Sequence, residues 1–281
     1  DLVRSRGLGD VYKRQGKEDE DPAMKRKTKK IGMLILLILI VMAPSGAISS
    51  DNLTQGKKIS APGKYEGYSE PIYRGVITKS VYVTMRDGVK LAVDYSLPRG
   101  LARSEKIPAI LVQTRYWRDM IIKIRTDPAQ KCLVSYGYAV VVVDVRGTGA
   151  SFGTWPFPWS EDEIKDGAEV VDWIISQPWS NGKVGTYGTS YVGATAEFLL
   201  VNQHPAVKAA VIRYSLYDSY TDIAFPGGIY HNWFMDTWNR ADQALDANDV
   251  ATLSEMMGIK LPFAEILPGV KPVGYPQKGN K

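Results

Sequence analysis

One serine stands out as a candidate for covalent chemistry. Ser190 follows Gly188 by two residues and precedes Gly193 by three. The residues before it, 183–187, favour a strand, and those after it, 194–200, favour a helix. Strand, sharp turn and helix in this order form a nucleophile elbow, in which a strained corner holds a hydroxyl out above a sheet. A serine between glycines also arises by chance, so the flanking elements carry the prediction that Ser190 is a nucleophile.

The elements that must position this serine alternate along the chain. Asp87 and Gly88 separate two β-rich runs, which predicts a hairpin. Residues 138–143 are almost wholly apolar and predict a buried strand, and residues 106–113 are nearly all apolar at their centre, as expected for a strand buried on both faces. Strands alternating with helices predict a mostly parallel α/β sheet with helices on both faces. Besides the elbow strand, the expected strands are residues 81–85, 89–95, 106–113, 138–143 and 207–212.

Helices and a cap complete the expected pattern. Ser160, with Glu163 three residues later, forms a capping box at the start of one helix, which Pro178 ends. Residues 119–135 favour another helix. Residues 218–260 are aromatic-rich and mostly helical in pattern, so they suit a cap that lies over the sheet.

Composition and spacing exclude several kinds of partner and cofactor. Of the net charge of +5, residues 1–47 contribute +4, with ten Lys and Arg against six Asp and Glu, so the rest of the chain has no basic excess for nucleic acid. Residues 144–153 have the wrong glycine spacing for a dinucleotide-binding loop. The two histidines, His204 and His231, and the single cysteine, Cys132, form no zinc-ligand pattern. We expect no cofactor and no metal, and a buried structural thiol near the end of a helix.

The amino end has the pattern of an exported protein. Residues 1–23 are polar and are interpreted as a non-native leader. Residues 24–47 combine a basic run, a 13-residue apolar stretch and small residues before a cut, which is typical of a secretory signal peptide. We expect a secreted or periplasmic protein without a membrane span after cleavage, in which residues 48–72 form a linker. The alternative is an uncleaved anchor over residues 31–48, although its apolar stretch is shorter than the ~20 residues that a spanning helix needs.

Four stretches also occur together in a recognisable order, namely residues 85–94, 114–116, 144–153 and 188–193. Each is weakly specific alone, but together they resemble the X-Pro dipeptidyl-peptidase and cocaine-esterase family of serine hydrolases, also called the CocE/NonD hydrolases. The serine motif departs from strict G-x-S-x-G and has this family's G-x-S-Y-x-G form. The resemblance covers roughly residues 76–235. It implies an α/β-hydrolase core, a helical cap and a carboxyl-terminal jelly-roll domain.

The resemblance also implies roles for three residues. Ser190 matches the nucleophile, while the backbone N–H of Tyr191 and the hydroxyl of Tyr116 match the two donors of the oxyanion hole. Two donors aimed at the developing oxyanion lower the barrier, and the loss of one typically costs ~3 kcal/mol. The structural alternatives stay open, in which Tyr116 is an ordinary loop tyrosine and Tyr191 packs at the start of a helix.

The base and the acid of a triad are harder to place. The usual chain order in this fold is Ser, then Asp or Glu, then His, and the resemblance places both partners beyond the cap. His204 ends the elbow helix and is interpreted as structural, and His231 is a poor candidate for the base. Asp218 and Asp222 follow the last strand, and surface or structural roles are favoured over a role in the substrate pocket. We therefore expect a fragment that lacks the triad Asp, the triad His and the jelly roll.

Two functions compete at this point. The first is a serine hydrolase that cleaves ester, amide or X-Pro peptide bonds of small molecules or short peptides through an acyl-enzyme on Ser190. The second is a non-catalytic α/β-hydrolase-like binding module. The expected domains are the amino-terminal part of the core over residues 73–217 and a truncated helical cap over residues 218–281, incomplete at the carboxyl end. The sequence does not determine the type of bond cleaved or the oligomeric state.

Overall fold

A computed structural model describes residues 59–61, 63–66, 70–118, 128–256 and 269–274 of the chain. The predicted leader and signal peptide lie outside the described residues, as do residues 119–127 of the predicted helix over 119–135. The strands are β1 (Ile59–Ala61), β2 (Lys64–Glu66), β3 (Val76–Thr84), β4 (Lys90–Pro98), β5 (Ile107–Thr114), β6 (Ala139–Asp144), β7 (Ser180–Thr189) and β8 (Val207–Arg213). The helices are α4 (Pro128–Ser135), α5 (Glu161–Ser176), α6 (Tyr191–Val201), the π-helix η1 (Tyr220–Ala224), the 3-10 helix η2 (Pro226–Gly228), α7 (Asn232–Asp246) and α8 (Val250–Met256).

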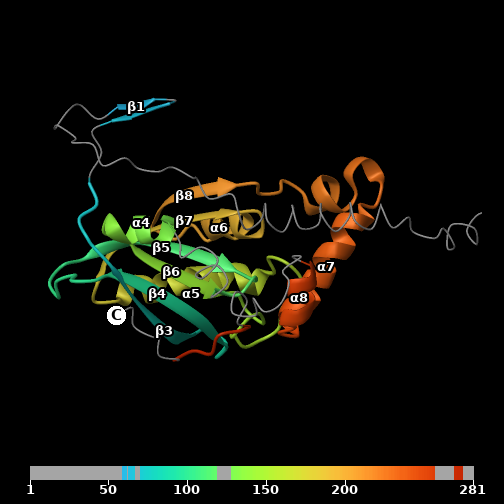
Figure 1. The fold of residues 1–281 in the computed structure, drawn as a ribbon, viewed down its shortest axis with the longest axis horizontal. Helices are drawn as coiled ribbons and strands as arrows, with labels where there is room; N and C mark the ends of the chain where they lie inside the picture. Colours follow the sequence, from blue (N-terminus) through green and yellow to red (C-terminus); the bar gives the residue numbers. More distant parts are fainter. Residues whose placement is uncertain (1–58, 62, 67–69, 119–127, 257–268, 275–281) are drawn as a thin grey trace, which may run out of the picture.

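Six strands form one sheet in the order β3-β4-β6-β5-β7-β8 (Figure 1). Strand β4 pairs antiparallel with β3 and β6, whereas the pairs β5–β6, β5–β7 and β7–β8 are parallel. The predicted mostly parallel α/β sheet is therefore confirmed. Because neighbouring parallel strands run in the same direction, β5, β6, β7 and β8 end at one edge of the sheet, and α7 and α8 lie beyond that edge (Figure 1).

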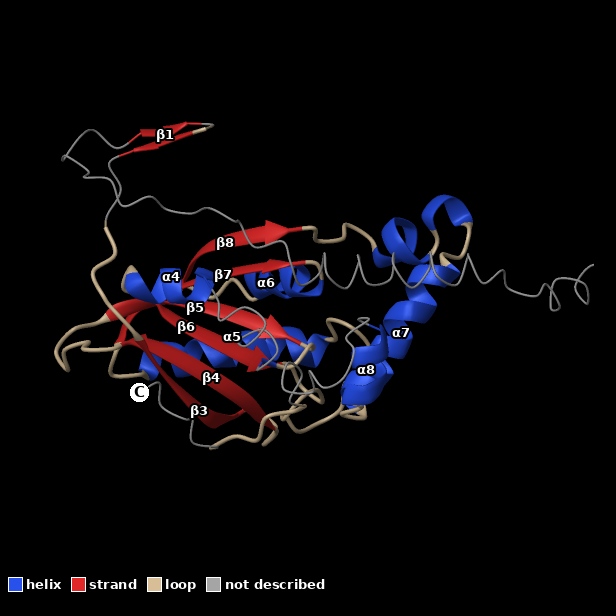
Figure 2. Cartoon of the chain, viewed as in Figure 1, coloured by secondary structure: helices blue, strands red, loops and turns tan. Residues whose placement is uncertain are grey.

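Helices cover both faces of the sheet (Figure 2). Val141 of β6 belongs to a buried cluster with Ile174 of α5 and Leu199 of α6. Its neighbour Val140 belongs to a second buried cluster with Val134 of α4. Successive side chains of a strand point to opposite faces, so β6 has to be apolar at every position to bury both. The prediction that residues 138–143 form a buried strand is confirmed.

The predicted hairpin between β3 and β4 is also confirmed. The two strands pair in register from Val76 opposite Pro98 to Thr84 opposite Lys90. The Met85 N–H donates to the Val89 carbonyl at 2.8 Å and closes the turn. Both strands extend further than the apolar pattern suggested, because their outer residues pair through the backbone whatever their side chains are.

The cap is helical, as predicted, and it rests on the loop that follows β5. Trp117 of that loop packs in a buried cluster with Ala244, Leu245 and Leu253 of α7 and α8. Its indole N–H also donates to the Leu245 carbonyl at 3.2 Å. The cap is thereby fixed to the sheet through the segment that carries Tyr116.

The segment predicted as a linker, residues 48–72, contains the two short strands β1 and β2, which pair antiparallel. One prediction needs correction. Cys132 lies in α4 near its end, as expected, but it is half-buried, because it borders a surface hollow lined also by Arg99 and Lys131. Among the described residues, no helix is both long and apolar enough to cross a bilayer.

Candidate active site

Ser190 occupies a strained corner between β7 and α6. Strand β7 ends at Thr189, α6 begins at Tyr191, and Ser190 between them has φ 60° and ψ −130°. Such a conformation is costly for a residue with a side chain and persists only where the surrounding structure enforces it. The Ser190 N–H donates to the Arg213 carbonyl of β8 at 2.9 Å, and its carbonyl accepts from the Ala194 N–H at 2.9 Å. The strand, turn and helix predicted around this serine are therefore present.

The two glycines of the motif permit this corner sterically. A Cβ on Gly188 would overlap the carbonyl oxygen of Val192, and a Cβ on Gly193 would overlap the carbonyl oxygen of Arg213. Both obstacles are backbone atoms, which cannot move aside as a flexible side chain does. The glycines let α6 approach β7 and β8 closely enough to turn Ser190 outward.

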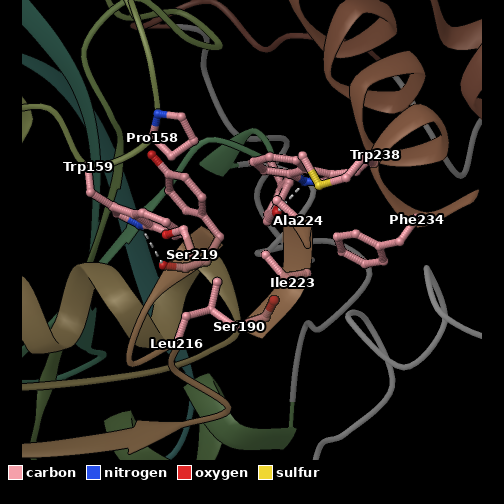
Figure 3. A pocket seen from close by; sticks show the side chains of 12 residues that line it. Pro158, Trp159, Ser190, Leu216, Ser219, Ile223, Ala224, Phe234 and Trp238 are labelled. Atoms are coloured by element: carbon pink, nitrogen blue, oxygen red, sulfur yellow. Dashed lines mark hydrogen bonds between the residues drawn. The ribbon is translucent and has the colours of Figure 1, made fainter. Parts of the chain in front are cut away.

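Ser190 opens into a pocket of about 330 Å³ between the sheet and the cap. Figure 3 shows Pro158 and Trp159 on one side of this pocket and Phe234 and Trp238 of α7 on the other. The twelve lining residues are Tyr116, Pro158, Trp159, Ser190, Tyr191, Leu216, Ser219, Ile223, Ala224, Phe234, Met235 and Trp238. All three residues predicted for the site are among them.

Tyr116 is positioned by the loop after β5 and by the cap. The indole N–H of Trp238 donates to the Tyr116 hydroxyl at 3.1 Å (Figure 3). This leaves the proton of that hydroxyl available, because the described residues offer it no acceptor. Desolvation by the surrounding side chains raises the pKa of Tyr116 above its ordinary value of 10.0, so the hydroxyl remains a donor at neutral pH.

Buried charges on either side of Tyr116 fix the same loop. The fully buried guanidinium of Arg115 binds the carboxylates of Asp242 and Asp246 on α7, and it lies over the Trp155 ring at 4.3 Å. Arg118 is buried as well and pairs with Asp94 at 2.9 Å. A buried pair that loses one partner is strongly destabilised, so these charges hold the loop in one conformation.

Tyr191 is held by a second polar cluster, centred on Glu163 of α5. The Tyr191 hydroxyl donates to Glu163 Oε1 at 2.6 Å and accepts from the Trp155 indole N–H at 3.2 Å. Its ring stacks on Trp159 at 5.1 Å and meets Tyr116 edge-on at 5.6 Å. These contacts fix the first residue of α6, whose backbone N–H has no partner inside the helix.

Only one of the two hydrogen bonds of the predicted capping box is present at the start of α5. Ser160 caps α5 as expected, and its hydroxyl accepts from the Glu163 N–H at 3.4 Å. One oxygen of the Glu163 carboxylate accepts from the Trp159 N–H at 3.0 Å rather than from the Ser160 N–H, and the other oxygen accepts from the Tyr191 hydroxyl. Burial raises the pKa of Glu163 to about 7, and the hydrogen bond from Tyr191 opposes this rise.

Neither histidine reaches the pocket. His204 follows α6, where its Nε2 lies 3.0 Å from Asp172 of α5 and its Nδ1 accepts from the Ala206 N–H at 3.1 Å. His231 caps the start of α7, and its ring stacks on Phe234 at 5.7 Å. Both contacts are structural, and no imidazole is among the pocket-lining residues of the part that the structure describes.

Asp218 and Asp222, which follow β8, accept hydrogen bonds within the turn that contains them. Asp222 accepts from the N–H groups of Tyr217 and Asp218 at 2.8 and 3.0 Å. Asp218 accepts from the hydroxyl of Thr221 at 2.7 Å, and that bond is the main reason why its pKa lies below the ordinary value. These bonds agree with the structural role favoured for both residues.

Sequence reasoning did not find Glu163 as a partner of the site, nor Trp238. Glu163 had a sufficient local explanation as a helix cap, and Trp238 lies 122 residues from Tyr116. The aromatic density of residues 218–260 was the only available signal for Trp238.

Comparison with known proteins identifies the family. The profile of X-Pro dipeptidyl-peptidase (S15 family) matches residues 87–257 of the 281. This chain belongs to the S15 family. The family predicted from the four motifs is therefore confirmed, and the matched residues of this S15 chain contain the elbow and the whole pocket lining.

Relatives support both the family and the fold. A protein of Mycobacterium bovis named a serine esterase is 50% identical over 226 residues, which cover 74% of this S15 chain and 35% of that protein. The cocaine esterase of a Rhodococcus species is 38% identical over 120 residues, or 42% of this chain and 20% of that protein. A CocE/NonD family hydrolase structure from Staphylococcus aureus has a TM-score of 0.53 at 26% identity, covering 70% of this chain and 40% of that one. An α-amino acid ester hydrolase shares the fold, with a TM-score of 0.51 at 24% identity over 80% of this chain and 40% of that one.

These comparisons confirm the α/β-hydrolase fold class of the core. The S15 chain spans about a third of the length of the mycobacterial relative, 35%. What the whole protein does therefore belongs to the proposal that follows.

Proposed function

We propose that this chain supplies the nucleophile and the oxyanion donors of a serine hydrolase that cleaves acyl bonds through an acyl-enzyme on Ser190. One observation carries the proposal, namely that Ser190 stands at a strained elbow with φ 60° and opens into a pocket lined also by Tyr116 and Tyr191. Strain at a serine that lines a pocket indicates a constraint beyond stability. The esterase names of two relatives support the same reaction class.

The reaction follows from the positions of these groups. Ser190 Oγ attacks the acyl carbon while a base accepts its proton, and the carbonyl oxygen becomes an oxyanion. The Tyr116 hydroxyl and the Tyr191 N–H donate to that oxyanion. The C–O or C–N bond to the leaving group then breaks, and the base returns its proton to the departing alcohol or amine. Water repeats the sequence on the acyl-enzyme and releases the acid.

The base has to come from outside the described lining of the pocket. A general base must lie within hydrogen-bond reach of the hydroxyl, about 3 Å, and an acidic partner must orient it. His204 follows α6, does not line the pocket, and has both ring nitrogens engaged, one with Asp172 at 3.0 Å and one with the Ala206 N–H at 3.1 Å. The proposal assigns both partners to a part of the whole protein that follows the cap in chain order, as the fold's usual order requires.

The second candidate function is a binding module without catalysis. The pocket and the fixed cap would suit such a role equally well, and the absence of an imidazole among the described lining residues favours it. The two functions differ in whether the Ser190 hydroxyl is nucleophilic. A binding module has no use for an activated serine.

The test is labelling of the full-length protein with a fluorophosphonate probe, which reacts only with activated serines. We expect labelling of the wild type and of Ser219→Ala, which removes the other serine of the pocket. Ser190→Ala should abolish labelling. Absence of labelling from the wild type would overturn the proposal in favour of the binding module, and labelling that survives in Ser190→Ala would show that another residue is the nucleophile.

A further inference from the structure

Among the described residues, none that lines the pocket around Ser190 carries an ionic side chain. Its twelve described lining residues include no carboxylate, ammonium, guanidinium or imidazole. Eight of them are aliphatic or aromatic without a hydroxyl, and the polar ones are two tyrosines and two serines. Two of the polar residues, Tyr116 and Tyr191, already have partners in Trp238 and Glu163.

The carboxylates nearest in sequence to the lining residues are engaged elsewhere. Asp218 and Asp222 flank Ser219 and hold the backbone of their own turn. Asp236, next to Met235, is exposed and accepts from the Tyr230 hydroxyl at 3.2 Å. None of these three aspartates is among the described residues that line the pocket.

The two buried carboxylates behind the pocket are also occupied. Glu163 lies beneath Tyr191, is 4% exposed and accepts three hydrogen bonds. Asp242 of α7 is bound to the guanidinium of Arg115. A cationic group that enters the pocket therefore meets aromatic and aliphatic surface, without a counter-ion among the described residues.

We propose that this pocket binds the acyl group of the substrate and selects an uncharged apolar one, such as a single ring or a short branched chain, over an acyl group that carries an ammonium. Naming the occupant as the acyl group rests on the proposed function. The physical reason is desolvation, because a charge taken from water into an apolar site must be repaid by a partner. A volume of about 330 Å³ also lies at the small end of the range of ligand pockets.

The inference narrows the family's range of substrates for this chain. A dipeptidyl acyl group carries a free amino-terminal ammonium on the acyl side of the bond that breaks. The same holds for an α-amino acid ester. The geometry favours esters or amides of uncharged acids over both.

The first test compares two esters that differ in one α-ammonium group, with each rate divided by the rate of hydrolysis in buffer alone. Nitrophenyl phenylacetate and its α-amino derivative have the same ring and leaving group, and the full-length protein is assayed at a pH where the amine is protonated. We expect kcat/KM to be higher for the neutral ester by about a hundredfold or more. Equal or faster cleavage of the amino ester would overturn the inference.

A carboxylate placed in the pocket should weaken this preference for the neutral ester. Ile223 of η1 lines the pocket, and Ile223→Asp supplies a carboxylate, while Ile223→Asn is a neutral control of the same size. We expect only Ile223→Asp to raise the ratio of amino ester to neutral ester, by about tenfold or more. Fluorophosphonate labelling of Ser190 in both variants reports that the site is folded. The same change of ratio in both variants would contradict a charge-based preference.

A binding measurement separates this inference from the proposed function. Trp159 and Trp238 line the pocket, so tryptophan fluorescence of Ser190→Ala reports occupancy without turnover. Phenylacetamide should bind more tightly than protonated phenylglycinamide. Equal binding overturns the inference and leaves the proposed function standing, whereas failure of the wild type to react with fluorophosphonate overturns the proposed function and, with it, the assignment of the occupant as an acyl group.

Discussion

The Tyr191 hydroxyl donates a 2.6 Å hydrogen bond to a carboxylate of Glu163 that is almost completely buried. This bond joins the first turn of α5 to the first residue of α6, so one carboxyl group fixes the residue that follows Ser190. Trp155 and Trp159 complete the cluster by donating to the other oxygen of Glu163. The backbone N–H proposed as an oxyanion donor is thus positioned by a group that never touches the substrate.

The first prediction concerns the pH dependence of stability through Glu163. Burial raises its pKa from the ordinary value of 4.5 to about 7. Between these values the unfolded chain releases the proton while the folded protein keeps it, so the free energy of unfolding falls as pH rises, and the loss is complete above about 7. Each unit of pKa difference corresponds to about 1.4 kcal/mol.

Glu163→Gln removes this titration and keeps the size of the side chain. We expect the variant to be less stable than the wild type near pH 5 and to equal or exceed it near pH 8, measured by urea unfolding of the full-length protein. Glu163→Ala is the control, since it loses the hydrogen bonds at every pH. If the difference in unfolding free energy between Glu163→Gln and wild type stays constant from pH 5 to pH 8, the pKa of Glu163 is not raised by burial.

The second prediction concerns the hydrogen bond that orients Tyr116. Trp238→Phe keeps an aromatic ring in the pocket but removes the N–H that lies 3.1 Å from the Tyr116 hydroxyl. We expect kcat to fall by about fivefold with a small change in KM, because the loss of a neutral hydrogen bond is worth roughly 1 kcal/mol and acts on the oxyanion donor. Trp233→Phe, on the same helix but outside the pocket lining, should change neither. A rise in KM alone would instead assign Trp238 to substrate binding.

The third prediction concerns the motif after β6, whose aspartate is structural. Asp144 is fully buried, pairs with Arg118 at 2.8 Å and accepts from the Ala150 N–H at 3.0 Å. Asp144→Asn should lower the free energy of unfolding by about 3 kcal/mol, because it leaves the buried guanidinium one carboxylate short. Asp87→Asn is the matched control, since Asp87 pairs with Arg146 from a side chain that is 39% exposed. Equal losses of unfolding free energy in the two variants would show that burial of the Asp144–Arg118 pair adds no stability.

Local patterns in the sequence were enough to predict most of the core. The elbow glycines, the hairpin at Asp87 and the buried strand β6 depend on short-range sterics and periodicity, which a single sequence displays. Partners far apart in the chain were not predictable in this way. Arg115 and Asp242 are 127 residues apart, and either one alone looks like a surface charge. Such contacts depend on where the cap docks, which no local pattern records.

The fourth prediction concerns export of the protein, and the segment that predicts it lies outside the described residues. The basic run, apolar stretch and small residues of the segment 24–47 predict cleavage after Ala47. Amino-terminal sequencing of the protein from culture medium or periplasm should begin within a residue or two of Ile48. Protein found only in the cytoplasm with Met24 still present would contradict export. Membrane-bound protein that keeps residues 31–48 would support the anchor instead.

The last prediction concerns residues 48–281 expressed alone, which should not turn over an activated ester such as nitrophenyl acetate. Acyl transfer needs a base about 3 Å from the Ser190 hydroxyl. His204 lies beyond the far end of α6, and the 11 residues of this helix, at about 1.5 Å per residue, separate it from Ser190 by roughly 17 Å. Its two ring nitrogens are also engaged with Asp172 and Ala206.

His231 is the other histidine of the chain, and its ring packs on Phe234 outside the pocket lining. Turnover by residues 48–281 should therefore match that of the same chain carrying Ser190→Ala. The edge strand β8, where Val211 is 57% exposed, makes aggregation a concern, so the assay is run on monomer isolated by size exclusion. Ser190-dependent turnover close to that of the full-length protein would mean that the base is already present. His231→Ala would then be the first variant to make, because His204 is held by α5.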